Sequence, residues 1–242
     1  MTIIFDLDYT LLDTVKFKDA LREAVTSLGV SAERYEETYK QIVKREGRAY
    51  DYDPDAHLEA LRADFGKPEA IVEARARIDG VLARTEEFLY PGSVEMVRKY
   101  RDAGARVVLL TMGNEQWQEA KAKHSGLAEL FDRVVTVGKG KSEALRGFAL
   151  EDSEVIIVND NGSEMKEMMG EVDKWRLASA EKGSAEKIPK MKFIMKRGPK
   201  PVPTGLALEP KELNEVERII DGEFPPGAFK PRESREGRLG RR

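Results

Sequence analysis

Two apolar runs in the second half of the chain restrict the fold more than any other feature. The segments ARVVLLT (105–111) and EVIIVND (154–160) are almost continuously apolar, and each ends in polar residues. Such runs are typical of strands buried on both faces of a parallel sheet. Helical patterns separate them, and strand, helix, strand, helix is the order of a doubly wound, Rossmann-like α/β fold.

The other elements are expected around these two runs. A short strand is expected at 2–7, and further strands at 133–137 and 191–196. Helices are expected from an N-cap at Ser93 to residue 103, and at about 114–124, 141–148, 163–169 and 212–220. The polar stretch 178–190 is expected to be a loop.

No strand pattern occurs between about residue 15 and residue 88. Apolar residues there recur at helical spacing, as in Phe17, Leu21, Ala24 and Leu28. We therefore expect an α/β core domain from residues 1–14 and 89–221, with an all-helical cap domain, 15–88, inserted after the first strand. The segment 222–242 is rich in Arg, Gly and Pro, and we expect a disordered basic tail.

Composition narrows the class of protein. The formal net charge of -3 argues against nucleic-acid binding by the folded body, which leaves the basic tail as the one place where it is conceivable. The chain has no cysteine, which excludes disulfides and thiolate chemistry. The start lacks a signal-peptide pattern, and no apolar run is long enough for a membrane span, so we expect a cytoplasmic protein without membrane contact.

Polar residues follow three of the predicted strands. Asp6 and Asp8 lie at the carboxyl end of the first, Thr111 ends the second, and Asp160 ends EVIIVND. Residues at i and i+2 of a regular strand face the same side, so Asp6 and Asp8 are expected to share one site with Asp160. Three converging carboxylates require a cation, and incomplete oxygen coordination favours Mg²⁺. A lysine of GKGKS, Lys139 or Lys141, would add positive charge for a phosphoryl group.

These elements, in this order, resemble the haloacid dehalogenase superfamily. Asp6-Leu7-Asp8-Tyr9-Thr10 matches its D-x-D-x-T motif, and Thr111, Lys141 and Val158-Asn159-Asp160 with Glu164 are similar to its other three. The helical insert looks like the C1 cap of the family. The pattern departs from the family at Tyr9, where glycine or asparagine is common, and at Asn159 and Glu164, where glycine and aspartate are usual.

The resemblance implies roles for these residues. Asp6 would be the nucleophile that forms an aspartyl-phosphate, and Asp8 would be the acid and base. Asp6, the backbone carbonyl of Asp8, and Asp160 would hold Mg²⁺, with Glu164 in support. Thr111 and Lys141 would bind the phosphoryl oxygens. Because the dehalogenase branch lacks the second aspartate and needs no metal, Asp8 favours phosphoryl transfer.

The sequence therefore predicts a Mg²⁺-dependent phosphatase for a small phosphorylated metabolite. A phosphomutase of the same superfamily, or a non-catalytic binding protein that retains the acidic pocket, are the alternatives. The cap is expected to set the choice of substrate, and the core to set the chemistry.

Overall fold

A five-stranded parallel sheet forms the centre of the molecule. The computed structural model describes residues 1–44, 51–149, 152–181, 188–198 and 210–223. Its strands are β1 (Thr2–Phe5), β2 (Arg106–Met112), β3 (Arg133–Val137), β4 (Glu154–Asn159) and β5 (Lys190–Met195). They lie in the order β3-β2-β1-β4-β5, and every pair is parallel. The predicted α/β fold with a doubly wound sheet is therefore confirmed.

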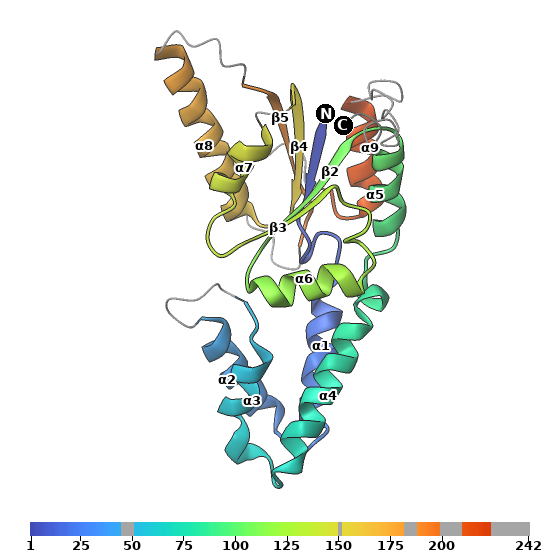
Figure 1. Cartoon of the computed structure of the whole chain (residues 1–242), viewed down its shortest axis with the longest axis vertical. Helices are drawn as coiled ribbons and strands as arrows, with labels where there is room; N and C mark the ends of the chain where they lie inside the picture. The colour runs from blue at the N-terminus through green and yellow to red at the C-terminus, as the bar shows by residue number, and fades with distance from the viewer. Residues whose placement is uncertain (45–50, 150–151, 182–187, 199–209, 224–242) are drawn as a thin grey trace, which may run out of the picture.

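Helices cover both faces of this sheet, which explains why the central strands are apolar throughout (Figure 1). Successive residues of β1 point to opposite faces, so Ile3 packs in one cluster and Ile4 in the other. The first cluster includes side chains of α5 (Ser93–Asp102) and α9 (Leu213–Glu223). The second includes side chains of α7 (Ser142–Ala149) and α8 (Gly162–Glu181).

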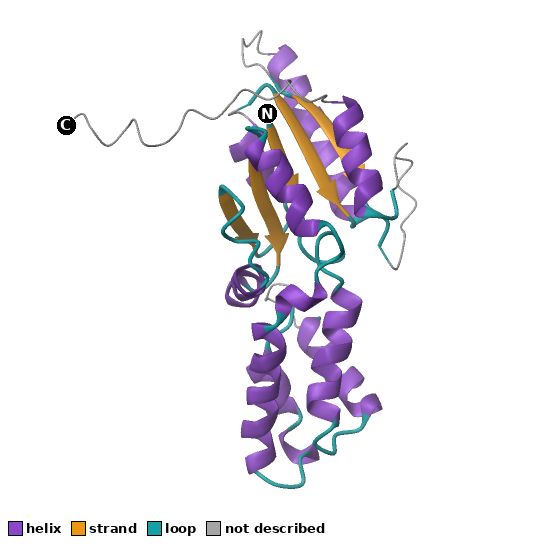
Figure 2. Ribbon diagram, turned by 90° about the vertical axis from the view of Figure 1, so that its right-hand side faces the viewer, coloured by secondary structure: helices purple, strands orange, loops and turns teal. Residues whose placement is uncertain are grey.

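The elements between Thr14 and Phe88 lie together beyond the carboxyl ends of the strands, and we refer to them as the helical segment (Figures 1 and 2). They are α1 (Thr14–Thr26), α2 (Ala32–Val43), α3 (Pro54–Ala60) and α4 (Glu69–Ala83), with the short 3-10 turns Arg62–Asp64 and Thr85–Phe88. Helix α6 (Glu115–His124) lies between the helical segment and the sheet. The proposal that residues 15–88 form a cap domain rests on this arrangement.

Three expectations about single elements are wrong. The first strand ends at Phe5 rather than at residue 7. Gly92, in the left-handed conformation with φ 85, is the N-cap of α5, while the Ser93 hydroxyl donates to the carbonyl oxygen of Leu11 at 2.8 Å. Helix α8 runs to Glu181, far beyond 163–169 and into the predicted loop 178–190.

The length of α8 has a packing cause. Met165, Met168, Val172 and Trp175 are buried against the sheet and keep helical spacing across Gly170. A glycine inside a helix costs about 1 kcal/mol relative to alanine, which such a stripe readily outweighs. Of the predicted tail, residues 222 and 223 belong to α9, and the remainder lies outside the described residues. In the described part of the chain, no helix has the length and apolarity of a membrane span.

Candidate active site

The predicted site residues meet at the carboxyl ends of the central strands. Asp6 follows β1, Thr111 is in β2, and Asp160 follows β4. They open into a cavity of about 320 Å³. Its lining combines side chains of the sheet edge and α6 with side chains of the helical segment, including Phe17, Lys18, Leu21, Tyr39, Val43, Asp51 and Tyr52. Open parallel sheets bind ligands at this edge.

Asp6 is the buried carboxylate at the centre of this site. Its side chain is only 8% exposed, and its Oδ1 accepts a 2.6 Å hydrogen bond from Nζ of Lys141. Burial raises the pKa of Asp6 to about 6, against the opposing effect of the Lys141 ammonium. At neutral pH Asp6 is therefore still ionised, and a desolvated carboxylate held by one lysine is suited to nucleophilic attack.

The structure distinguishes the two candidate lysines. Lys141 is buried and bridges Asp6 and Glu164, with its Nζ 2.8 Å from Oε2 of Glu164, whereas Lys139 is exposed. The two carboxylates hold the pKa of Lys141 above its usual range although burial opposes this. Lys141 thus carries a permanent positive charge beside Asp6, as expected for a ligand of phosphoryl oxygens.

Asp160 lies beside Asp6 with an unsatisfied carboxylate. It makes no hydrogen bond or ion pair to any described residue, and burial together with Asp6 and Glu164 raises its pKa to about 8. A Cβ at Gly198 would lie 2.9 Å from Oδ2 of Asp160, so the glycine leaves room there. An unpartnered acid next to a second carboxylate fits a hard cation such as Mg²⁺.

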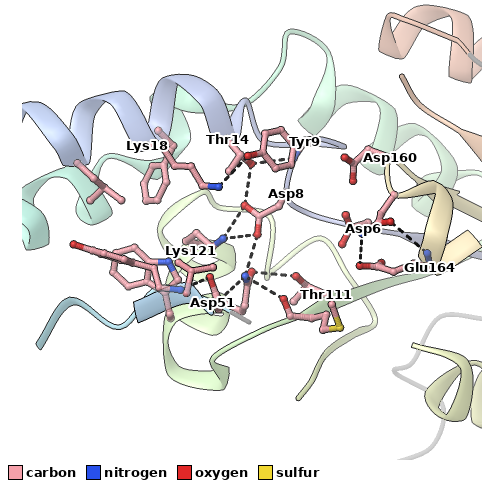
Figure 3. A pocket seen from close by; sticks show the side chains of 18 of the residues that line it. Asp6, Asp8, Tyr9, Thr14, Lys18, Asp51, Thr111, Lys121, Asp160 and Glu164 are labelled. Atoms are coloured by element: carbon pink, nitrogen blue, oxygen red, sulfur yellow. Dashed lines mark hydrogen bonds and ion pairs between the residues drawn. The ribbon is translucent and has the colours of Figure 1, made fainter. Parts of the chain in front are cut away.

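The side chain of Asp8 does not join this pair. It points toward α6, where its two oxygens accept hydrogen bonds of 2.8 and 2.6 Å from Nζ of Lys121 (Figure 3). Because β1 ends at Phe5, the expectation that Asp6 and Asp8 share one face of a regular strand is wrong. Among the described residues no three acidic or histidine side chains are arranged to hold a metal. If Asp8 contributes a metal ligand, it does so through its backbone carbonyl, and the predicted metal set stays a prediction.

The partners of Asp8 determine its protonation. Gln118 Nε2 donates to its Oδ2 at 3.0 Å, and the Thr14 hydroxyl donates to its Oδ1 at 2.9 Å. Burial alone would raise the pKa of Asp8, but Lys121 and these two donors outweigh burial and lower the pKa to about 2. Asp8 is therefore a carboxylate at neutral pH, and in this contact it binds a proton less readily than a free aspartate does.

Gln118 connects the sheet edge with the helical segment. Its Oε1 accepts from the Thr111 hydroxyl at 3.0 Å, and its Nε2 donates to Oδ2 of Asp51 at 2.7 Å. The same carboxylate oxygen accepts from the backbone N–H of Asn114 at 3.1 Å, at the start of α6. A Cβ at Gly113 would overlap Asp51, so a glycine there permits the contact.

Sequence reasoning missed Gln118, Lys121 and Asp51. Gln118 and Lys121 are three residues apart and therefore lie on one face of α6. Trp117 and Ala122 of the same helix are also buried. Two long polar side chains among buried apolar ones are a signal that the interior contains polar groups for them to bind. Asp51 belongs to a segment without helical pattern, and nothing in the sequence points to its contact with α6.

Comparisons with known proteins agree with this arrangement. The family model described as haloacid dehalogenase-like hydrolase matches residues 1–166. No curated protein matches the chain in sequence.

Solved structures match almost over the full length. One is provisionally described as a haloacid dehalogenase-like hydrolase from Burkholderia xenovorans LB400 (18% identity, 92% of this chain and 96% of that chain, TM-score 0.64). A second, provisionally a hydrolase of this type from Bacillus subtilis, is bound to magnesium (17%, 91% and 98%, TM-score 0.54). A third is provisionally a β-phosphoglucomutase from Thermotoga maritima (15%, 91% and 98%, TM-score 0.56), and dehalogenases also match.

At these identities the similar structures show a shared fold and no more. The family model is the stronger finding, because it covers more than half of the chain and includes every predicted site residue. The chain belongs to the haloacid dehalogenase-like hydrolases.

Proposed function

We propose that the protein is a Mg²⁺-dependent phosphatase that hydrolyses a small phosphorylated metabolite through an aspartyl-phosphate on Asp6. One observation carries this proposal. The buried Asp6 lies beside the cationic Lys141 and beside Asp160, which no described residue binds, while a second aspartate, Asp8, is held two residues further on by separate donors. A dehalogenase of this superfamily would need neither Asp8 nor a metal ion.

The chain's own residues account for the chemical steps. The Asp6 carboxylate attacks phosphorus, and the bond from phosphorus to the leaving oxygen breaks with its electron pair on that oxygen, which takes a proton from solvent water and leaves as the alcohol. Lys141 is a donor to the phosphoryl oxygens, and the Thr111 hydroxyl is a second donor once it turns from Oε1 of Gln118. In the second step Asp8 accepts a proton from the attacking water, which releases phosphate and regenerates Asp6.

Two features of the site would support these steps. Mg²⁺, when bound by Asp6 and Asp160, would neutralise charge that develops on the transferred group. Since Asp8 is ionised in its contact with Lys121, it has no proton to give at neutral pH. We therefore expect esters with acidic leaving groups, such as aryl phosphates, to react faster than alkyl phosphates.

The test is phosphate release from p-nitrophenyl phosphate and from a panel of phosphorylated metabolites, with Mg²⁺ or with a chelator. The proposal expects release that requires Mg²⁺ and Asp6. Conversion of a sugar phosphate into its isomer would favour a phosphomutase, for which the fold similarity to a β-phosphoglucomutase is the present support. Halide release from a 2-haloacid without metal would favour a dehalogenase, and no turnover of any substrate would favour a binding protein.

A further inference from the structure

Lys18 is an ammonium on the wall of the cavity that no carboxylate of the described residues pairs with. Of the three lysines among the described lining residues, the other two are bound by carboxylates, Lys121 by Asp8 and Lys141 by Asp6 and Glu164. The Nζ of Lys18 instead donates to the neutral Tyr9 hydroxyl at 2.9 Å, and no described carboxylate pairs with it. Lys18 comes from α1, in the helical segment, so it faces the cavity from the side opposite the sheet edge (Figure 3).

Aromatic rings hold this ammonium in place. Its Nζ lies 5.3 Å from the centroid of the Tyr9 ring and 5.6 Å from that of the Tyr39 ring. Cation–π contacts of this kind orient an ammonium without neutralising its charge.

The backbone of Tyr9 has an unusual, left-handed conformation. Among the described residues, Tyr9 is the one non-glycine residue with a positive φ, 58°. Its N–H donates to the Thr14 hydroxyl at 2.9 Å, and its carbonyl oxygen accepts from Nζ of Lys196 at 3.0 Å. A glycine would adopt this left-handed conformation without steric cost. What tyrosine adds is a ring and a hydroxyl, and both contact Lys18.

Apolar side chains line part of the described wall beside Lys18, together with polar groups such as Thr14 and Asp51. The Trp117 ring packs 6.0 Å from Phe17 and 5.2 Å from Tyr52, and Leu21 and Val43 also line the cavity. Among the described lining residues, Lys18 is a cation without a carboxylate partner, and aromatic and aliphatic side chains lie beside it. Such a site is complementary to a ligand with an apolar body and an anionic group.

We infer that the natural substrate carries a second anionic group, a carboxylate or a second phosphoryl group, on the part released as alcohol, and that Lys18 binds it. This inference rests on the proposed phosphatase function, because it assigns the first phosphoryl group to Asp6, Thr111 and Lys141. Lys18, oriented by Tyr9, is then the specificity-determining residue of the helical segment.

Binding of phosphonates tests the inference without turnover, because their carbon–phosphorus bond is not an ester. Phenylphosphonate, its meta- and para-carboxy derivatives and phenylene bisphosphonate are titrated by calorimetry in the presence of Mg²⁺. We expect at least one anionic derivative to bind the wild type about tenfold more tightly than phenylphosphonate, since a charge-assisted hydrogen bond is gained. A preference for the carboxy derivatives alone identifies a carboxylate, and a preference for the bisphosphonate alone identifies a second phosphoryl group.

Two variants and one control assign the preference. Lys18→Met keeps the length of the side chain, and it should abolish the preference while phenylphosphonate binds as before. Tyr9→Gly suits the left-handed backbone and removes the ring and hydroxyl, so it should fold and lose most of the preference. Lys16→Met alters an exposed lysine of the same helix that pairs with Asp13, and it should behave as the wild type.

A preference that survives Lys18→Met, or a wild type that binds all probes equally or none, would overturn the inference. Turnover of p-nitrophenyl phosphate is measured separately on the same samples. Turnover without charge preference refutes the role of Lys18 alone, whereas charge preference without turnover refutes the phosphatase alone.

Discussion

The sheet edge and the helical segment face the same cavity with different kinds of surface. At the sheet edge, acidic side chains are held by lysines in short contacts, as in Asp6 with Lys141 and Asp8 with Lys121. The described part of the helical segment contributes mainly aromatic and aliphatic side chains, and no carboxylate there pairs with Lys18. We propose that this difference reflects a division of roles, in which the sheet edge performs the reaction and the helical segment selects the ligand.

The largest effect is expected when the sheet edge loses its nucleophile. Asp6→Asn keeps the shape of the side chain but cannot form the acyl phosphate, so kcat should fall by about 10³-fold or more. Phosphonate binding beside Lys18 should persist, which would separate reaction from recognition. Steady-state phosphate release checks this, with the exposed Asp19→Asn on α1 as control. Near-normal turnover by Asp6→Asn would remove the covalent mechanism.

The next effect concerns the ion pair of Asp8. Lys121→Met leaves a largely buried carboxylate without its cation, and we expect a loss of about 3 kcal/mol in the free energy of unfolding. The exposed Lys123→Met on the same helix should cost almost nothing. Urea unfolding at neutral pH measures both. Equal stability of the two variants would mean that Lys121 does not stabilise the charge of Asp8.

Lys121→Met should also change how the stability of the protein depends on pH in acid. The pKa of Asp8 is lowered from 3.8 to about 2, so the folded state binds this proton less readily than the unfolded state. Asp8 therefore contributes stability that is complete above about pH 4 and is lost as the pH falls toward 2. In Lys121→Met this contribution should disappear, and acid unfolding profiles of the two proteins should converge below pH 3.

The helical segment should lose stability at a higher pH than the one at which Asp8 takes up its proton. His57 is buried between the Thr38 hydroxyl, 2.8 Å from its Nε2, and the Tyr52 hydroxyl, 3.1 Å from its Nδ1. Burial lowers the pKa of His57 from 6.5 to about 4. The unfolded state thus binds more protons between these values, and stability that is complete above pH 6.5 is lost as the pH falls toward 4.

We expect the titration of His57 to lower the free energy of unfolding by about 2 kcal/mol when the pH falls from 7 to 5. Thermal unfolding at the two pH values measures the loss, and His57→Gln should flatten it. His124→Gln changes the exposed histidine of α6 and should keep the wild-type dependence. An unchanged pH dependence in His57→Gln would place the titrating group elsewhere.

The smallest effect is expected where the two regions touch. Asp51→Ala removes the acceptor for the Asn114 amide and for Gln118, and Gly113→Ala would push Asp51 away sterically. Each should cost about 1 kcal/mol and raise hydrogen exchange of the Asn114 amide, while Glu59→Ala on the exposed face of α3 should not. If exchange at Asn114 stays slow in both variants, Asp51 does not join the two regions.

The sequence could predict the site residues that end strands better than those that reach the site from helices and distant loops. Asp6, Thr111 and Asp160 follow buried strands, and a parallel sheet brings such positions to one edge regardless of the loops. Lys121 and Asp51 reach the site through helix orientation and a contact distant in sequence, which no local pattern encodes. The side chain of Asp8 turned away because β1 ended earlier than its apolar pattern indicated.

Other predictions concern ligands, partners or the cell, and none of these is part of the chain. The metal set, the phosphate-binding roles of Thr111 and Lys141, and the substrate depend on ligands. The cytoplasmic location and a nucleic-acid contact of the basic tail depend on the cell and on partners. They stay predictions.

Trapping of phosphate on Asp6 tests the central claim most directly. The protein is mixed with p-nitrophenyl phosphate and Mg²⁺, quenched with acid within the first turnover, and digested. Mass spectrometry should find one phosphoryl group on the peptide that ends at Lys16, located at Asp6, and none when Mg²⁺ is chelated or Asp6 is replaced by Asn. Phosphate release without any adduct on that peptide, or with an adduct on another residue, would contradict the account.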